Sequence, residues 1–326
     1  MALSRYGYFY HADPLLMTAA KLLFAGTPDF ALASLRALHG AGFIPDAVLT
    51  QPDRPAGRGK KISESPVKLF AREHDIAVWQ PQSLKDAEIV AQISKSNPDL
   101  IIVAAYGLLL PQAVLDLPER GCLNVHASLL PRWRGAAPIQ AAILEGDSQT
   151  GVSLMQMEAG LDTGPVMASA AISIGEEETA GALQGRLAIL GGELLIDKID
   201  EILQGKLEAI PQDDALATYA GKIRKRDAAI DWGLAAAQIS RKIRAYDPVP
   251  GASFDLDGEI VKCWKAEPLD GGEGPTGTIL SAGKDGVVVA CAEGALRLTE
   301  IQRPGRRRIT AAEFAGQSNL TGKRLH

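Results

Sequence analysis

Apolar runs and amphipathic segments alternate along the first two thirds of the chain. Residues 21–25 and 100–104 are continuously apolar, which is typical of strands buried on both faces of a parallel sheet. In residues 28–40 and 84–96, apolar side chains instead recur at helical spacing. This alternation predicts a Rossmann-like, doubly wound and mainly parallel α/β sheet, with residues 100–104 near its centre.

The turn after the first predicted strand bears on cofactor use. Thr27 and Pro28 suit the N-cap and the first position of a helix. The glycine fingerprint of dinucleotide-binding sites, G-x-G-x-x-G, is missing from this turn. Although the predicted topology is similar to that of dinucleotide-binding proteins, we therefore expect no NAD.

The pattern changes after Gly205. Residues 206–222 include a Pro-Gln-Asp-Asp sequence and are predicted to be a linker. Short strand-like segments follow, separated by glycines at short intervals, which is typical of a small β-barrel. We expect an α/β catalytic domain over 17–205 and an OB-like β-barrel domain over 223–326, the latter interrupted by one helix over 233–245.

Composition narrows the class of protein. The 326 residues carry a net charge of −5, which argues against attraction of the whole surface to nucleic acid. Three distant cysteines without metal-ligand spacing suit a reducing compartment, and no run is long and apolar enough to span a membrane. We expect a cytoplasmic protein with no metal and no membrane contact.

Residues 1–16 lack the apolar core of a signal peptide, and we expect them to be an extension before a natural start at Met17.

Polar groups suited to acyl chemistry lie in and after a short apolar strand. Because alternate side chains of a strand share a face, Asn124 and His126 are expected to point the same way. An asparagine amide can donate to an oxygen that gains negative charge, and a histidine can accept and return a proton near neutral pH. Asp162 is the best candidate to orient the histidine, because glycines on both sides let its backbone bend inward.

Each of these three residues has a common structural role when it is considered alone. His126 is more often a hydrogen-bonded core histidine, Asn124 a turn residue and Asp162 a turn cap. In combination with their neighbours, they resemble the formyltransferases that use 10-formyltetrahydrofolate. The resemblance is carried by Asn124-x-His126, Ser128-Leu129-Leu130-Pro131, Arg134-Gly135-Ala136 and Leu161-Asp162-Thr163-Gly164.

The resemblance implies a reaction and a set of roles. An amine would attack the formyl carbon of 10-formyltetrahydrofolate, the co-substrate, without a covalent enzyme intermediate. Asn124 and His126 would stabilise the tetrahedral oxyanion, and Asp162 would hold His126, favour its cationic form and help to move the proton. Backbone groups of one further segment would shape the folate side of the site: Ser128, Leu129, Leu130 and Pro131.

A basic segment over residues 51–68 is rich in proline and glycine, which argues against helix or strand. It is either a solvated loop or a clamp for phosphates. The resemblance favours the clamp, since family members that formylate methionine on initiator Met-tRNA approach the acceptor arm with a loop at this place. The candidate contacts are Arg54, Arg58, Lys60 and Lys61.

The C-terminal third carries four further basic runs. A charge run is usually a solvated face, but four runs on a barrel that often binds nucleic acid favour an RNA surface. The resemblance implies the same, since these transferases hold tRNA with an oligonucleotide-binding-like domain. The runs contain Lys222, Arg224, Lys225 and Arg226; Arg241, Lys242 and Arg244; Arg303, Arg306, Arg307 and Arg308; and Lys323 and Arg324.

Two other classes of function stay open from the sequence. One is a formyltransferase or hydrolase that acts on a small molecule, with the C-terminal domain serving oligomerisation. The other is a non-catalytic RNA-binding protein, against which the intact set of Asn124, His126 and Asp162 argues. We expect a monomer whose partners are initiator Met-tRNA and the folate.

Overall fold

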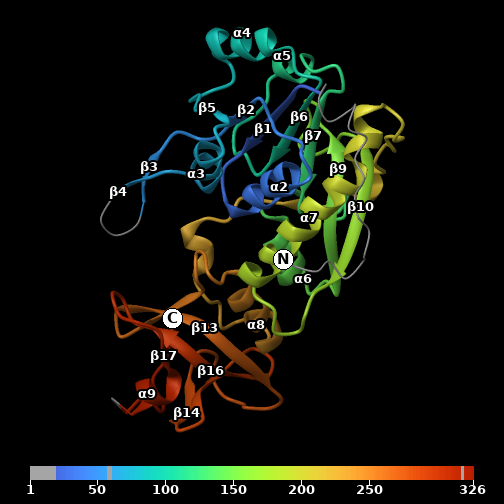
Figure 1. Cartoon of the computed structure of the whole chain (residues 1–326). Coiled ribbons are helices and arrows are strands. Elements are labelled where there is room, and N and C mark those ends of the chain that lie inside the picture. Colours follow the sequence, from blue (N-terminus) through green and yellow to red (C-terminus); the bar gives the residue numbers. More distant parts are fainter. Residues whose placement is uncertain (1–19, 57–60, 317–318) are drawn as a thin grey trace. The chain divides into compact units, whose positions relative to one another are not determined.

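The structure, a computed structural model, describes residues 20–56, 61–316 and 319–326 (Figure 1). The chain divides into two compact units. The first contains the described residues up to 135, together with 151–172 and 184–219. The second contains 136–150, 173–183 and the described residues from 220 to the end.

A seven-stranded sheet forms the core of the first unit. Its strand order is β10-β9-β7-β6-β1-β2-β5, so the most apolar strand, β6, is central, as predicted. Strands β5, β2, β1, β6 and β7 are parallel neighbours, and β9 runs antiparallel to β7. The predicted Rossmann-like, mainly parallel sheet is therefore confirmed. The strands are β1 (Leu22–Gly26), β2 (Ala47–Leu49), β5 (Ala77–Trp79), β6 (Leu100–Ala104), β7 (Cys122–His126), β9 (Gln149–Gln156) and β10 (Val166–Ser173).

Helices α2 and α7 pack closely against each other beside this sheet. A Cβ atom at Gly192 of α7 would meet Ala33 and Ala37 of α2, so the small residue permits the close approach.

Within the described residues, no helix is long and apolar enough to span a membrane. The α-helices among the described residues are α2 (Asp29–Gly40), α3 (Pro66–Glu73), α4 (Ala87–Ser96), α5 (Gln112–Leu115), α6 (Pro138–Glu145), α7 (Ala180–Leu203), α8 (Ala236–Ala245) and α9 (Ala311–Ala315).

The predicted N-cap of α2 is wrong. Pro28 occupies the cap position, and no side chain caps the helix. The Thr27 hydroxyl instead donates a hydrogen bond of 3.1 Å to the main-chain oxygen of Tyr106. It therefore ties the carboxyl end of β1 to the turn that follows β6, a contact between residues 79 positions apart.

The second unit is built on a curled antiparallel sheet, a half-barrel in the order β12-β13-β16-β15-β14, with β17 paired to β16. Irregular register near Lys265, where β13 meets β16, bends the long strand. The expected small β-domain is confirmed, and its helix α8 lies within the predicted range. The strands are β12 (Ser253–Leu256), β13 (Glu259–Leu269), β14 (Ile279–Gly283), β15 (Gly286–Ala290), β16 (Ala295–Gln302) and β17 (Ile309–Thr310).

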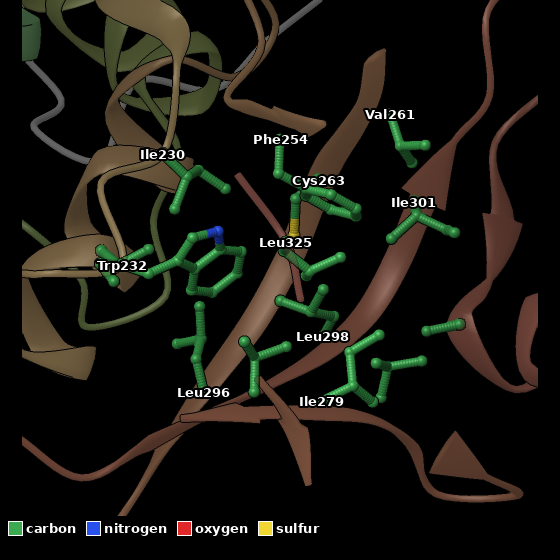
Figure 2. Close-up of a cluster of buried hydrophobic side chains, with 14 of the residues drawn as sticks. Ile230, Trp232, Phe254, Val261, Cys263, Ile279, Leu296, Leu298, Ile301 and Leu325 are labelled. Atoms are coloured by element: carbon green, nitrogen blue, oxygen red, sulfur yellow. The ribbon is translucent and has the colours of Figure 1, made fainter. Parts of the chain in front are cut away.

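An apolar core fills the concave side of this sheet (Figure 2). The rings of Trp232 and Phe254 meet edge to face, with their centroids 6.0 Å apart. Leu298 and Ile301 of β16 belong to the same cluster and are almost completely buried. Because each fully buried aliphatic side chain contributes about 1.5–3 kcal/mol, this cluster stabilises the half-barrel.

The three cysteines are buried and unpaired, as their separation in the sequence suggested. Cys122 lies on β7, Cys263 on β13, and Cys291 directly after β15. Burial raises the pKa of Cys122 to about 12 and that of Cys291 to about 11, and it also raises the pKa of Cys263. These thiols therefore act as small apolar side chains.

Candidate active site

Asn124 and His126 lie at the carboxyl end of β7, beside the carboxyl end of the central strand β6. Ligands of open α/β sheets bind at this edge. Strand alternation turns Leu123 and Val125 to the opposite face, where both are buried. Asn124 is partly exposed, whereas His126 is only 6% exposed. The strand therefore presents one accessible amide and one buried ring on the same face.

The contacts of His126 define its protonation. Its Nε2 lies 3.2 Å from the main-chain oxygen of Trp133, and a carbonyl oxygen can only accept, so Nε2 carries the proton. In the neutral ring, Nδ1 is then the proton acceptor. Nδ1 lies 3.8 Å from Oδ2 of Asp162, which is close enough for a charge interaction but too long for a hydrogen bond.

Burial and the neighbouring carboxylate act on His126 in opposite directions. Desolvation lowers its pKa, and the negative charge of Asp162 opposes that effect without overcoming it. Asp162 therefore favours the cationic ring, as expected, but burial of the ring outweighs that effect in the unliganded site. His126 is a neutral proton acceptor near pH 7.

Asp162 sits in a strained turn. Its φ angle is +51°, a left-handed conformation that is uncommon for residues other than glycine. Its Oδ2 accepts a hydrogen bond of 2.8 Å from the main-chain N–H of Gly135. The flanking glycines have a different role from the one expected: a Cβ atom at Gly160 would overlap with the side chain of Thr163, and one at Gly164 with the main-chain oxygen of Gln156. They permit close packing, while the bend lies at Asp162 itself.

The predicted folate segment forms a self-bonded loop. The fully buried hydroxyl of Ser128 donates to the main-chain oxygen of Arg132 at 2.6 Å. The hydroxyl of Ser153 donates to the oxygen of Ser128 and accepts from the N–H of Leu130. The Ser128 side chain is therefore occupied in holding the loop. The partly exposed residues available to a ligand are Leu129, Leu130 and Pro131.

Tyr106 lies in the turn after β6, near the carboxyl end of the sheet. It is 2% exposed, and its hydroxyl has no hydrogen-bond partner among the described residues. Burial raises the pKa of this hydroxyl. Its main-chain oxygen, by contrast, accepts from Thr27 and from the side chain of Gln51. The ring belongs to the core, and the backbone holds the turn together.

Of the predicted phosphate contacts in the basic segment, only Arg54 can be placed with its side chain. It is exposed and forms no ion pair with any residue that the structure describes. Contrary to the prediction, the flanks of the segment form a two-stranded ribbon, β3 (Arg54–Ala56) against β4 (Lys61–Ser63). Arg58 and Lys60, as well as the side chain of Lys61, lie outside the described residues.

The cations of the basic runs in the C-terminal unit differ in whether protein groups already bind them. Arg303 forms a two-pronged ion pair with Glu259, and Arg308 pairs with Asp247 and Glu300. Other cations of these runs donate to main-chain oxygens, including Arg241, Lys242 and Arg244. The cations of the first run are also exposed: Lys222, Arg224, Lys225 and Arg226. One of them, Arg226, lies 3.9 Å from the carboxylate of Asp227.

Sequence reasoning missed two polar residues that contact the site from the segment predicted to be a linker. Gln212 donates to the main-chain oxygens of Asp162 and Gly164, and the hydroxyl of Thr218 accepts from the N–H of Trp133. A glutamine and a threonine in a polar segment carry no signal of such contacts. The partners lie 48 to 85 positions away in the sequence.

Two family models match this chain. The one described as formyl transferase matches residues 20–199, and the one described as formyl transferase, C-terminal domain, matches residues 222–319. The chain therefore belongs to the formyl transferase family.

Two curated relatives show how close the similarity is. A protein of Aromatoleum aromaticum is 54% identical over 300 residues, which cover 91% of this chain and 95% of the relative. A protein of Janthinobacterium sp. is 51% identical over 315 residues, covering 94% and 99% of the two chains. Both relatives are named methionyl-tRNA formyltransferase.

Solved structures with low identity share the fold. HypX from Aquifex aeolicus, in complex with tetrahydrofolic acid, superimposes with a TM-score of 0.61 at 20% identity, over 93% of this chain and 48% of HypX. The sugar 3N-formyl transferase WlaRD superimposes with a TM-score of 0.63 at 17% identity, over 88% of this chain and 99% of WlaRD. These two proteins therefore share the fold of this chain.

Proposed function

We propose that this protein transfers the formyl group of 10-formyltetrahydrofolate to the α-amino group of methionine on initiator Met-tRNA, for translation initiation. Relatives that carry the name of this activity are about half identical to it over more than nine tenths of the chain. The structural observation that carries the proposal is the approach of Nδ1 of His126 to the carboxylate of Asp162, at 3.8 Å, beside Asn124.

The proposed reaction is a direct transfer. The amino nitrogen forms a bond to the formyl carbon, N10 of tetrahydrofolate leaves with the electrons of its bond to that carbon, and a proton passes from the amine to N10. The Asn124 amide donates to the oxygen that becomes negative in the tetrahedral intermediate. One such donor contributes about 3–4 kcal/mol in acyl transfer.

His126 supplies the proton transfer in this scheme. Its neutral Nδ1 accepts the proton of the attacking amine, since burial keeps the ring unprotonated near pH 7. Asp162 then stabilises the imidazolium for as long as it holds the proton, which passes on to the leaving nitrogen. The folate lies against Leu129, Leu130 and Pro131, and Ser128 fixes their loop from inside.

The proposed tRNA contacts begin at the exposed Arg54 and continue over Arg58, Lys60 and Lys61. The catalytic domain spans 17–205, and the OB-like tRNA-binding domain spans 223–326. The family models, which match 20–199 and 222–319, support this division. We propose that the enzyme acts as a monomer in the cytoplasm, with no metal.

A formyl-transfer assay tests the proposal. Purified protein and 10-formyltetrahydrofolate are mixed with charged initiator Met-tRNA, with free methionine, or with no acceptor. We expect formyl-methionine on the tRNA alone. Formate release without an acceptor, and no formylated tRNA, would replace the proposal with a hydrolase activity. Formylation of free methionine at an equal rate would remove tRNA from the reaction.

A further inference from the structure

The segment predicted to be a linker, residues 206–222, is hydrogen-bonded into the candidate active site. Gln212 uses its whole amide group there. Its Nε2 donates to the main-chain oxygen of Asp162 at 2.9 Å and to that of Gly164 at 2.6 Å. Its Oε1 accepts from Nε of Arg134 at 3.0 Å. One side chain thus joins the turn of the catalytic carboxylate to a buried guanidinium.

Arg134 is the buried residue that donates to Gln212. It is 1% exposed, the largest fully buried side chain in the described part of the molecule, and its Nη2 donates to Asp214 at 2.8 Å. Its two neighbours in the sequence contact both catalytic side chains. The oxygen of Trp133 lies against Nε2 of His126, and the N–H of Gly135 donates to the carboxylate of Asp162.

These contacts oppose a known strain. An aspartate with a φ angle of +51° is held in a conformation that costs about 1–3 kcal/mol and persists only where the surroundings over-determine it. Both main-chain oxygens that Gln212 holds, those of Asp162 and Gly164, belong to this turn. Gln212 therefore acts where the turn would otherwise relax.

We propose that Gln212 and Arg134 are positioning residues for the transfer. Together they fix the turn of Asp162 and the loop of Trp133 and Gly135, and so set the separation of Asp162 from His126. This inference rests on the proposed function, because it assigns the two residues a role in the same site. The part of segment 206–222 around Gln212 then supports the turn of Asp162 as well as connecting the domains.

Gln212→Glu is the sharpest test. The change keeps the size of the side chain but turns a carboxylate oxygen toward two carbonyl oxygens. We expect kcat for formylation to fall about 10- to 100-fold, since small misplacements of catalytic groups have effects of this size. KM for tRNA and folate should stay within about twofold, since neither substrate touches Gln212 in this scheme. Gln92→Glu, the same change on the exposed face of α4, should leave kcat and KM unchanged.

A double-mutant cycle separates positioning from general stability. In single-turnover measurements, Gln212→Glu should lower the rate by less than about twofold when it is added to Asp162→Asn, because it acts through that carboxylate. If the two losses multiply, or if Gln212→Glu retains the full rate, the inference is wrong. Should Gln212→Glu fail to fold, Gln212→Met, which removes donor and acceptor without adding a charge, is measured in the same cycle. Failure of the wild-type protein to formylate Met-tRNA would instead remove the proposed function.

Discussion

The site around β7 and the basic segment after β2 hold their side chains in opposite ways. His126 is almost completely buried, and both of its ring nitrogens face a defined protein atom. Arg54 is exposed and has no ion-pair partner among the described residues. Proton transfer requires atoms that are fixed to a fraction of an ångström. Binding to a phosphate of the tRNA instead requires a side-chain charge that is exposed and free to reach that phosphate.

The comparison also sorts the other cations of the protein. Arg303 is exposed like Arg54, but its guanidinium is already bound to Glu259. Binding to phosphate would require it to give up that pair, so an accessible charge is not by itself an available one. Exposed cations without a carboxylate partner are therefore the better candidates for binding RNA.

The largest effect is expected in the buried region. Asp162→Asn removes the charge that stabilises protonated His126, and kcat for formylation should fall about 10²- to 10⁴-fold. Binding of tRNA, measured by filter retention, should change by less than about twofold. Asp75→Asn is the matched control, because Asp75 is an exposed aspartate with a φ angle of +55°. A near-normal rate for Asp162→Asn would remove this carboxylate from the mechanism.

The second largest effect is expected from a change in the packing of the Asp162 turn. In Gly164→Ala the new methyl group overlaps with the main-chain oxygen of Gln156, and the free energy of unfolding should fall by about 1–3 kcal/mol. Gly185→Ala, in the exposed part of α7 with no atom nearby, should instead raise it by about 0.5–1 kcal/mol. Urea denaturation measures both, and equal effects would show that the turn tolerates a side chain.

Burial of His126 predicts a dependence of stability on pH. Because the pKa of His126 is lowered in the folded protein, the unfolded chain binds the proton first as the pH falls below the ordinary value of 6.5. The free energy of unfolding of the wild type, relative to His126→Gln, should therefore decrease below pH 6.5, by at most about 1.4 kcal/mol per pH unit. Parallel profiles for the two proteins would mean that the ring titrates as it does in water.

The smallest effect is expected in the basic segment. Arg54→Ala should weaken tRNA binding about two- to fivefold at low salt, and the salt dependence of log K should lose about 0.7–0.9 from its slope. Arg303→Ala should change neither quantity, since this arginine is bound to Glu259. Equal losses for the two variants would contradict the distinction between free and paired cations.

The sequence patterns predicted what depends on near neighbours. Alternation along β7 correctly placed Asn124 and His126 on one face, and the apolar run over 100–104 correctly identified the central strand. The first prediction rests on the two-residue period of a strand and the second on a continuous apolar run, and both patterns can be recognised from a few consecutive residues.

What could not be predicted depends on partners far apart in the sequence. The Thr27 hydroxyl binds the turn after β6 instead of capping α2, and Gln212 reaches a turn about 50 positions away. The charge of His126 depends on the balance between burial and a carboxylate, and only the three-dimensional structure gives that balance. The pairing of Arg303 with Glu259, 44 positions away, belongs to the same class.

The buried thiols can report which of the two units unfolds first. Only a thiolate is readily alkylated, and the raised pKa values of Cys122 in the first unit and of Cys263 and Cys291 in the second leave almost none at neutral pH. A thiol regains its ordinary reactivity when the unit around it unfolds. The cysteine that a brief pulse of reagent labels first therefore identifies which of the two units loses its structure first.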